Sequence, residues 1–190
     1  MTRRFFLVLL CIIAAGAPAA AQSTAQSTAT VVILVRHAEK AAAPAADPPL
    51  TEAGVARARA LATALADANV RAVITTELIR TRETARPLAD ALGLPLETVH
   101  TGALGVHAKA VADAVRAHAG QTVLVVGHSN TIPSIIAALG GPRFSDICDT
   151  QYSNLFVLIV RPGDKKADLV VSSYGAPSPD PATTCQGSMK

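Results

Sequence analysis

Two short apolar runs constrain the fold of this chain more than any other feature of its sequence. Residues 31–35 read VVILV and residues 122–126 read TVLVV, and neither run contains a charged side chain. Runs of this length, rich in β-branched residues and apolar on both faces, are typical of parallel strands that helices cover on each side. The segment RAVITT, residues 71–76, predicts another strand.

Alanine-rich stretches with helical character separate these strands. One helix should begin at Thr51, with Glu52 in its first turn, and run to about residue 68. A second is expected over residues 77–92, bent by Pro87 and ended by Gly93, and a third over residues 107–120. Alternating strands and helices predict an α/β fold, a three-layer α/β/α sandwich on a mostly parallel sheet.

The C-terminal part of the chain predicts a hairpin. The runs LFVLIV, residues 155–160, and ADLVVSSY, residues 167–174, are separated by the turn sequence RPGDKK. We therefore expect an antiparallel strand at the edge of the sheet. The predicted organisation is a single domain over residues 31–175, followed by a C-terminal tail at residues 176–190.

The N-terminus predicts export. Residues 1–21 contain two arginines, an apolar run from Phe5 to about residue 15, and small residues before Gln22, which are the three parts of a secretory signal peptide. We expect cleavage after Ala21, a polar linker at residues 22–30, and a periplasmic or secreted protein without stable membrane association. The alternative is a retained membrane anchor, although the apolar run is short for a spanning helix.

Charge and cysteine content limit the possible partners. Removing residues 1–21 takes two arginines from a chain whose formal net charge is only +3, and no basic run or aromatic platform appears elsewhere. A nucleic-acid partner therefore has no electrostatic support. Cys148 and Cys185 remain after cleavage, and in an exported protein they form either a disulfide that ties down the tail or two unpaired thiols.

Two pairs of polar residues stand at strand ends. Arg36 and His37 follow the first strand, and Gly127 and His128 follow the strand at residues 122–126. Ligands bind such sheets beyond the carboxyl ends of the strands, and Arg80 should lie near the same edge in the first turns of its helix. Two histidines and two arginines there favour a compact dianion, because guanidinium groups hold phosphate oxygens and stay charged.

A fourth helix should begin just after the second histidine. Ser129 or Asn130 is expected near its N-terminal cap and Pro133 in its first turn. The amides of this helix start would add to an anion site. A neutral imidazole nitrogen can attack phosphorus when cations hold the charge of the transferred group.

The motifs VRHAEK, LTEAG, TTELIRTRETA and VGHSN, in this order, resemble the histidine phosphatase superfamily, which includes cofactor-dependent phosphoglycerate mutases and acid phosphatases. The resemblance covers about residues 31–160. It implies that His37 becomes transiently phosphorylated, that Arg36, Arg80 and His128 bind the phosphoryl group, and that water hydrolyses the phosphohistidine. It implies neither a metal nor a cofactor. Within the superfamily, the chain resembles the branch that carries an RHxE-type motif.

The sequence departs from this family at the general acid. Many members carry a glutamate in a loop well after the second helix, whereas the segment LETVHTGALGVHAKA has Glu97 too early and no replacement. Asp47 and Glu39 are the remaining candidates near the site, with Ser129 and Asn130 as further substrate-binding candidates. Without a strong acid, such an enzyme favours acyl phosphates, phosphoramidates or aryl phosphates.

Each candidate also has a structural interpretation. His37 and His128 can be capping or core histidines, and Arg82 or Arg86 offers the same chemistry as Arg80, although only Arg80 fits the motif position. We assign structural roles to His100, His107 and His118, and we expect His118 to be exposed near a helix end. A metal site that uses Glu39 and two histidines is disfavoured because the arginines repel a cation.

Two hypotheses remain open. The first is an exported phosphatase that acts on a small phosphorylated substrate or a phosphoprotein. The second is a binding or interaction module that keeps the phosphate pocket without turnover. The loops AAAPAADPP and HTGALGVHA carry few charges, which argues weakly against a large, highly charged substrate.

Overall fold

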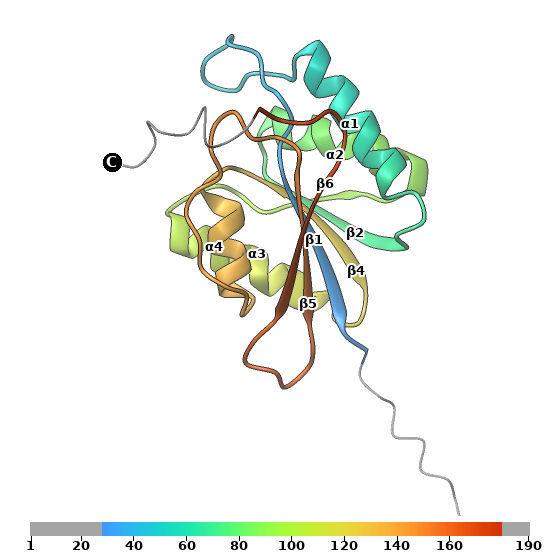
Figure 1. Ribbon diagram of the computed structural model, residues 1–190, viewed down its shortest axis with the longest axis vertical. Helices are drawn as coiled ribbons and strands as arrows, with labels where there is room; N and C mark the ends of the chain where they lie inside the picture. Colours follow the sequence, from blue (N-terminus) through green and yellow to red (C-terminus); the bar gives the residue numbers. More distant parts are fainter. Residues whose placement is uncertain (1–27, 180–190) are drawn as a thin grey trace, which may run out of the picture.

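The computed structural model describes residues 28–179, in which a six-stranded sheet carries four helices (Figure 1). The strands are β1 Thr30–Arg36, β2 Val70–Thr75, β3 Leu96–Thr98, β4 Thr122–Gly127, β5 Asn154–Val160 and β6 Asp168–Ser173. The helices are α1 Glu52–Ala64, α2 Ile79–Leu92, α3 Leu104–Ala117 and α4 Thr131–Ala138.

The strand order confirms the expected mixed sheet. The strands lie in the order β3-β2-β4-β1-β5-β6. The first four are parallel to one another, whereas β5 pairs antiparallel with β1 and β6 antiparallel with β5. The C-terminal hairpin therefore forms the antiparallel edge, and the parallel strands β2, β4 and β1 end side by side.

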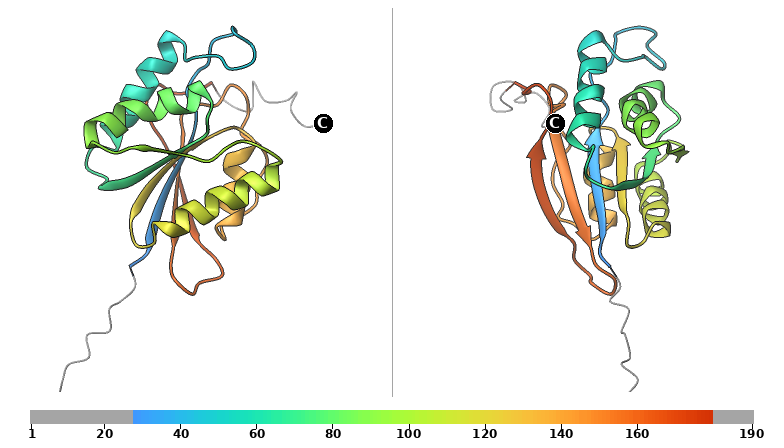
Figure 2. Two further views of the ribbon diagram at one scale, coloured as in Figure 1. Left: turned by 180° about the vertical axis from the view of Figure 1, so that it is seen from behind. Right: turned by 90° about the vertical axis from the view of Figure 1, so that its right-hand side faces the viewer.

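Two helices cover each face of the sheet (Figure 2). Alternate residues of β1 show this division, because Ile33 and Val35 pack with residues of α1 and α2, whereas Val32 and Leu34 pack with residues of α3 and α4. Strands that are buried on both faces need apolar residues at every position. This requirement explains the continuous runs VVILV and TVLVV, and the α/β three-layer expectation is confirmed.

Several element boundaries differ from those expected. Helix α1 ends at Ala64 rather than near residue 68, and the chain then turns into β2 through Asn69, whose φ of 53° is in the left-handed region that asparagine tolerates. Helix α2 begins at Ile79 instead of residue 77, and α3 runs from Leu104 to Ala117 instead of residues 107–120. The short strand β3 was not predicted, because three residues carry no periodicity.

Several expected segments lie at the two ends of the chain. The expected signal peptide, its cleavage after Ala21 and most of the linker lie outside the described residues, as does the tail from residue 180 onwards. Within residues 28–179, no helix is long and apolar enough to span a bilayer. The start of the expected tail contacts the domain, since the Ala176 carbonyl accepts a hydrogen bond from Arg57 and the Ser178 hydroxyl accepts two from the backbone of residues 152 and 153.

Candidate active site

The register of two parallel strands brings the two histidines together. Arg36 lies level with Gly127 in the β1–β4 pair, and the His37 amide donates to the Gly127 carbonyl at 2.9 Å. The next residues, His37 and His128, therefore leave the sheet beside each other, with ring centroids 5.4 Å apart in an edge-to-face arrangement. The two residues are only 3% and 9% exposed, respectively.

His37 is held with one ring nitrogen free. Its Nδ1 lies 2.7 Å from the Ala38 carbonyl oxygen, and because a carbonyl only accepts, Nδ1 carries the proton and donates it. Burial lowers the pKa of His37 to about 3, and the positive charges of Arg36 and Arg80 contribute in the same direction. The ring is therefore neutral at pH 7, and its Nε2 carries an available lone pair.

Thr84 connects the end of β1 to helix α2. Its hydroxyl oxygen accepts a 2.9 Å hydrogen bond from the Ala38 amide, and its hydroxyl donates at 2.7 Å to the Arg80 carbonyl one turn earlier. Thr84 and Ala38 are both fully buried. This contact fixes the backbone that orients the His37 ring and places the first turn of α2 against the same strand end.

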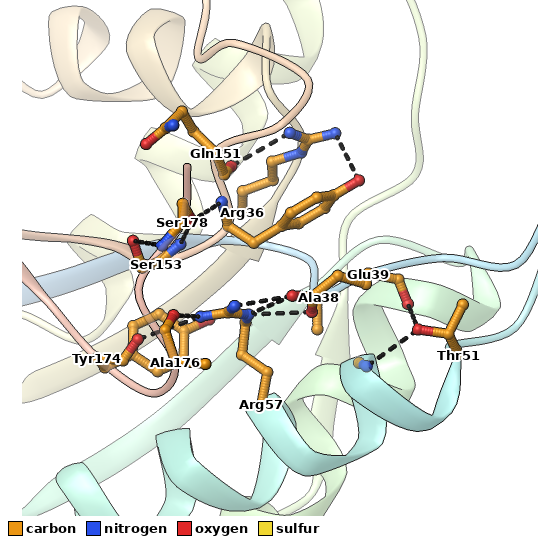
Figure 3. Close-up of polar contacts among 12 residues, drawn as sticks. Arg36, Ala38, Glu39, Thr51, Arg57, Gln151, Ser153, Tyr174, Ala176 and Ser178 are labelled. Atoms are coloured by element: carbon orange, nitrogen blue, oxygen red, sulfur yellow. Dashed lines mark hydrogen bonds and ion pairs between the residues drawn. The ribbon is translucent and has the colours of Figure 1, made fainter. Parts of the chain in front are cut away.

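Arg36 lies in a cage formed by the loop after α4. Its Nη1 donates to the carbonyls of Cys148, Asp149 and Gln151 at 3.0, 3.0 and 3.2 Å. Figure 3 shows the contact with Gln151. Its guanidinium carbon lies 4.2 Å from the centre of the Tyr152 ring, and its Nη2 lies 3.5 Å from the Tyr152 hydroxyl. The loop thus holds the guanidinium rigidly beside His37, where a cation and an aromatic face attract each other.

Arg80 reaches the site from the first turn of α2. Its Nη1 lies 3.6 Å from Asp47 Oδ1, and burial lowers the pKa of its guanidinium. Asp47 also accepts from the Ile79 amide at 3.0 and 3.2 Å, so it caps the start of α2 from the loop after β1. Asp47 thus positions α2 and Arg80 together.

The two arginines share an unusual feature. The Nε–H groups of Arg36 and Arg80 are both buried, and neither has a hydrogen-bond acceptor among the described residues. A buried donor without an acceptor costs about 1–3 kcal/mol. An oxyanion between the guanidinium groups would supply the acceptors.

His128 is surrounded by hydroxyl groups and backbone. Its Nε2 lies 3.3 Å from the Thr76 hydroxyl at the end of β2, and burial lowers its pKa to about 4. The chain turns sharply here, since a Cβ on Gly127 would lie 2.9 Å from both the Thr131 hydroxyl and the Ile132 side chain. Glycine permits this approach of α4 to the end of β4.

The residues expected near the cap of α4 are placed as follows. Asn130 is the N-cap residue, but its side chain makes no capping hydrogen bond, and the Ser129 carbonyl accepts from the Ile147 amide. Pro133 lies in the first turn of α4, as expected. The hydroxyl that bonds to the backbone here is that of Thr131, which accepts from the His128 amide at 2.9 Å.

Glu39 is engaged by an arginine that the sequence interpretation missed. Arg57 Nε donates to both carboxylate oxygens at 2.9 and 3.0 Å, and its Nη2 adds a 2.7 Å contact (Figure 3). Burial opposes ionisation of Glu39, but these hydrogen bonds outweigh it and lower its pKa. The close contact of α1 requires Gly54, because a Cβ there would clash with the Glu39 carbonyl. Arg57 also donates to the Tyr174 and Ala176 carbonyls.

Glu77 connects the start of α2 to the loop before α3. Its carboxylate accepts hydrogen bonds from the Thr101 amide and hydroxyl. Burial opposes ionisation of Glu77, but these hydrogen bonds outweigh it and lower its pKa. Its negative charge also acts on Arg80 and His128, so the loop around Thr101 borders the site.

The other three histidines lie as follows. His107 is buried, and its Nδ1 donates to the His100 carbonyl at 2.9 Å, whereas its Nε2 has no partner among the described residues. The His100 ring is exposed. His118 caps the end of α3 and lies 2.8 Å from Glu97, so it is partly buried rather than exposed.

Of the two cysteines expected after signal cleavage, Cys148 lies within the described residues. Cys148 is disulfide-bonded and belongs to the loop that encloses Arg36. Cys185 lies outside the described residues, so its pairing with Cys148 stays a prediction. Among residues 28–179, no group of three or more His, Cys, Asp or Glu side chains is arranged to hold a metal ion.

Comparison with known structures gives the same fold. The protein histidine phosphatase SixA, solved with tungstate, matches at 19% identity and a TM-score of 0.60, over 75% of this chain and 96% of that chain. A mycobacterial glucosyl-3-phosphoglycerate phosphatase matches at 15% identity and a TM-score of 0.63, over 77% and 100%. A protein from Nakamurella multipartitia, proposed to be a SixA phosphohistidine phosphatase, matches at 28% identity and a TM-score of 0.56, over 80% and 99%.

Sequence comparison adds a family match. A search of curated proteins gives no match. The family description "Histidine phosphatase superfamily (branch 1)" matches residues 32–101, a range that contains Arg36, His37 and Arg80 but not His128. In this match and in its fold, the chain is similar to the histidine phosphatase superfamily.

Proposed function

We propose that this protein is a phosphatase that forms a phosphohistidine on His37. One arrangement carries the proposal: a buried, neutral imidazole with Nε2 free stands beside two guanidinium groups whose buried Nε–H groups lack acceptors. A phosphoryl group bound there would meet a nucleophile and cationic donors at once. Phosphoryl transfer needs mainly positioning and charge stabilisation, which this arrangement provides.

In the first step, the Nε2 lone pair of His37 attacks phosphorus and forms a P–N bond. The P–O bond to the leaving group breaks, and its electron pair stays on the leaving oxygen. Nδ1 keeps its proton and its hydrogen bond to Ala38, so the charge on the phosphorylated ring is stabilised at that nitrogen. Water then attacks phosphorus, and inorganic phosphate leaves as the P–N bond breaks.

The surrounding residues have distinct parts in this scheme. Arg36 and Arg80 hold the phosphoryl oxygens, since their guanidinium groups present several N–H donors in a plane. His128 lies next to His37 and offers a further polar contact to the same oxygens. Asp47 positions Arg80 through their ion pair. Thr84 positions His37 through its hydrogen bond to the Ala38 amide.

The fold does not identify the substrate, so the substrate class is part of the proposal. SixA is named as a protein histidine phosphatase, and the mycobacterial neighbour as a phosphatase of glucosyl-3-phosphoglycerate. Both fold similarly to this chain at low identity, so we propose only the class, a phosphomonoester or related phosphoryl compound. A panel of a phosphohistidine peptide, a phosphoramidate and sugar phosphates would separate these possibilities.

The first test uses p-nitrophenyl phosphate, whose leaving group needs little protonation. Wild-type protein should release phosphate and carry an acid-labile, alkali-stable phosphoryl group, whereas His37→Ala should show neither. His118→Ala is the matched control, because His118 lies at the far end of α3 and pairs with Glu97. Turnover with and without a chelator tests the expectation that no metal is needed.

The outcomes separate the hypotheses. Wild-type turnover in His37→Ala would refute the assignment of the nucleophile. Phosphate-dependent thermal stabilisation without turnover on any substrate would instead indicate a binding module, because a ligand that binds only the folded state stabilises it.

We also propose that the protein is exported after removal of residues 1–21. The support is the three-part pattern of that segment, with arginines, an apolar run and small residues. Production of the full chain in a bacterium with two membranes, followed by fractionation, should give a periplasmic or secreted protein that begins at Gln22. A chain made from residue 22 onwards is the control and should stay inside, whereas an intact N-terminus on the full chain would contradict the proposal.

A further inference from the structure

Cleavage of an alkyl phosphate requires a proton for the leaving oxygen. Three carboxylates near the site, those of Asp47, Glu39 and Glu77, are engaged by donors, and a fourth, that of Asp149, lies 3.5 Å from Arg36 Nη2 on a side chain that is 88% exposed. Asp47 accepts hydrogen bonds from the Ile79 amide and pairs with Arg80. Hydrogen bonds keep the pKa values of Glu39 and Glu77 below their usual range. The donors around Glu39 and Glu77 thus favour the ionised form of these two side chains.

Tyr152 brings a hydroxyl group to the same place. Its ring centre lies 6.4 Å from that of His37, and its hydroxyl lies 3.5 Å from Arg36 Nη2. A phenol is protonated at neutral pH and can donate. Tyr152 is partly exposed, in contrast to His37 and Arg36, so it forms part of the wall between the buried nucleophile and the solvent.

The backbone around Tyr152 is fixed from both sides. The amide of Tyr152 donates to the Ser178 hydroxyl oxygen at 2.9 Å, and so does the amide of Ser153. The preceding carbonyl, that of Gln151, accepts from Arg36 (Figure 3). A rigid backbone keeps the ring under the guanidinium group and limits the positions that the hydroxyl can take.

We propose that the Tyr152 hydroxyl is the proton donor to the leaving group, an inference that rests on the proposed phosphatase function. As the His37 Nε2–P bond forms and the P–O bond breaks, the leaving oxygen takes the Tyr152 proton and departs as an alcohol. The tyrosinate that remains lies beside the Arg36 guanidinium, whose positive charge stabilises it. Arg36 thus serves both the phosphoryl oxygens and the phenolate.

The second half of the reaction restores the donor. The attacking water gives one proton to the tyrosinate oxygen as its own oxygen bonds to phosphorus. The P–N bond breaks, its electron pair returns to Nε2, and phosphate leaves. His37 and Tyr152 then have the protonation states with which they began, so no external acid or base is consumed.

The test compares two substrates in Tyr152→Phe. This variant keeps the ring under Arg36 and removes only the hydroxyl. With glycerol 2-phosphate, whose alkoxide needs a proton, kcat/KM should fall by about 100-fold or more, whereas with p-nitrophenyl phosphate it should fall by less than about 5-fold. The inhibition constant of inorganic phosphate should change by less than about twofold, because Arg36 keeps all its N–H donors and the carbonyls that accept from it.

Tyr174→Phe is the matched control. The Tyr174 hydroxyl is buried without a hydrogen-bond partner among the described residues, so its removal should leave both activities unchanged.

Four results would overturn the proposal. They are equal losses on the two substrates, a parallel rise in the phosphate inhibition constant, an unchanged rate with glycerol 2-phosphate, and a wild-type enzyme that hydrolyses only the aryl ester. Failure of the phosphatase function itself would look different, since wild-type protein would then not turn over even p-nitrophenyl phosphate.

Discussion

Replacing Thr84 with valine tests the connection between the nucleophile and helix α2. The substitution preserves the shape of the side chain but removes the acceptor of the Ala38 amide and the donor to the Arg80 carbonyl. Because the site is fully buried, the Ala38 N–H group loses its partner without access to water. A buried donor left unpaired costs about 1–3 kcal/mol.

Two effects reduce this cost. The new methyl group gains about 0.8 kcal/mol from burial. The Arg80 carbonyl lies within helix α2, so it loses little when the hydroxyl is removed. We therefore expect the free energy of unfolding to fall by about 1–2 kcal/mol, which lowers Tm by about 3–6 °C for a domain of this size.

Urea unfolding of Thr84→Val, together with phosphatase kinetics, measures both consequences. The value of kcat should fall more than KM rises, because the backbone that orients His37 loosens while the two arginines stay in place. Thr63→Val is the matched control, since the Thr63 hydroxyl makes the same one-turn contact to the Arg59 carbonyl on the exposed side of α1 and accepts no amide. Equal stability of Thr84→Val and wild type, or an equal loss in Thr63→Val, would refute the reasoning.

Two further predictions concern pH and the C-terminal segment. The pKa values of His37 and His128 lie near 3 and 4 in the folded state, below the unperturbed 6.5. The free energy of unfolding is therefore unaffected by these two groups above pH 6.5 and decreases as the pH falls below that value. At pH 5, 1.5 units below 6.5, each histidine should remove up to about 2 kcal/mol, and unfolding of His37→Gln in phosphate-free buffer between pH 7 and 5 should lose about half of this dependence. Arg57→Met should lower the unfolding free energy by about 2–3 kcal/mol, because it breaks a largely buried pair and releases two carbonyls. Arg161→Met, which breaks an exposed pair with Asp168, should leave the unfolding free energy almost unchanged, and equal effects of the two variants would contradict the importance of burial.

The sequence was sufficient to predict every strand except β3, and the residues at the strand ends. Continuous apolar runs identify strands buried on both faces, and the position of a histidine directly after each run identifies the edge where the rings meet. The structure adds the register, which places Arg36 level with Gly127. Helix ends were less predictable, because the residues after Ala64 are good helix formers and only the conformation of Asn69 shows the turn.

The contacts that hold the site together were not predictable from local patterns. Glu39 is paired by Arg57, 18 residues away, and Arg36 is caged by carbonyls more than 110 residues away. Carbonyl groups carry no sequence signal, and Tyr152 lies in no motif that resembles the family. Such contacts depend on how the loop after α4 folds back over β1, which the sequence of the strand cannot indicate.

The same cations that would bind a phosphoryl group also prepare the nucleophile. Burial is the main cause of the low pKa of His37, and Arg36 and Arg80 lower it further because a protonated ring would lie beside two positive charges. A bound dianion offsets that repulsion and raises the pKa of the ring. The free site therefore keeps His37 neutral. In the proposed mechanism, the phosphoryl group supplies, after attack, the negative charge that stabilises the cationic ring until water cleaves the P–N bond. If burial alone kept the imidazole neutral, no nearby cations would hold the phosphoryl group whose negative charge stabilises the phosphorylated ring. This requirement explains why guanidinium groups and imidazole share one strand end.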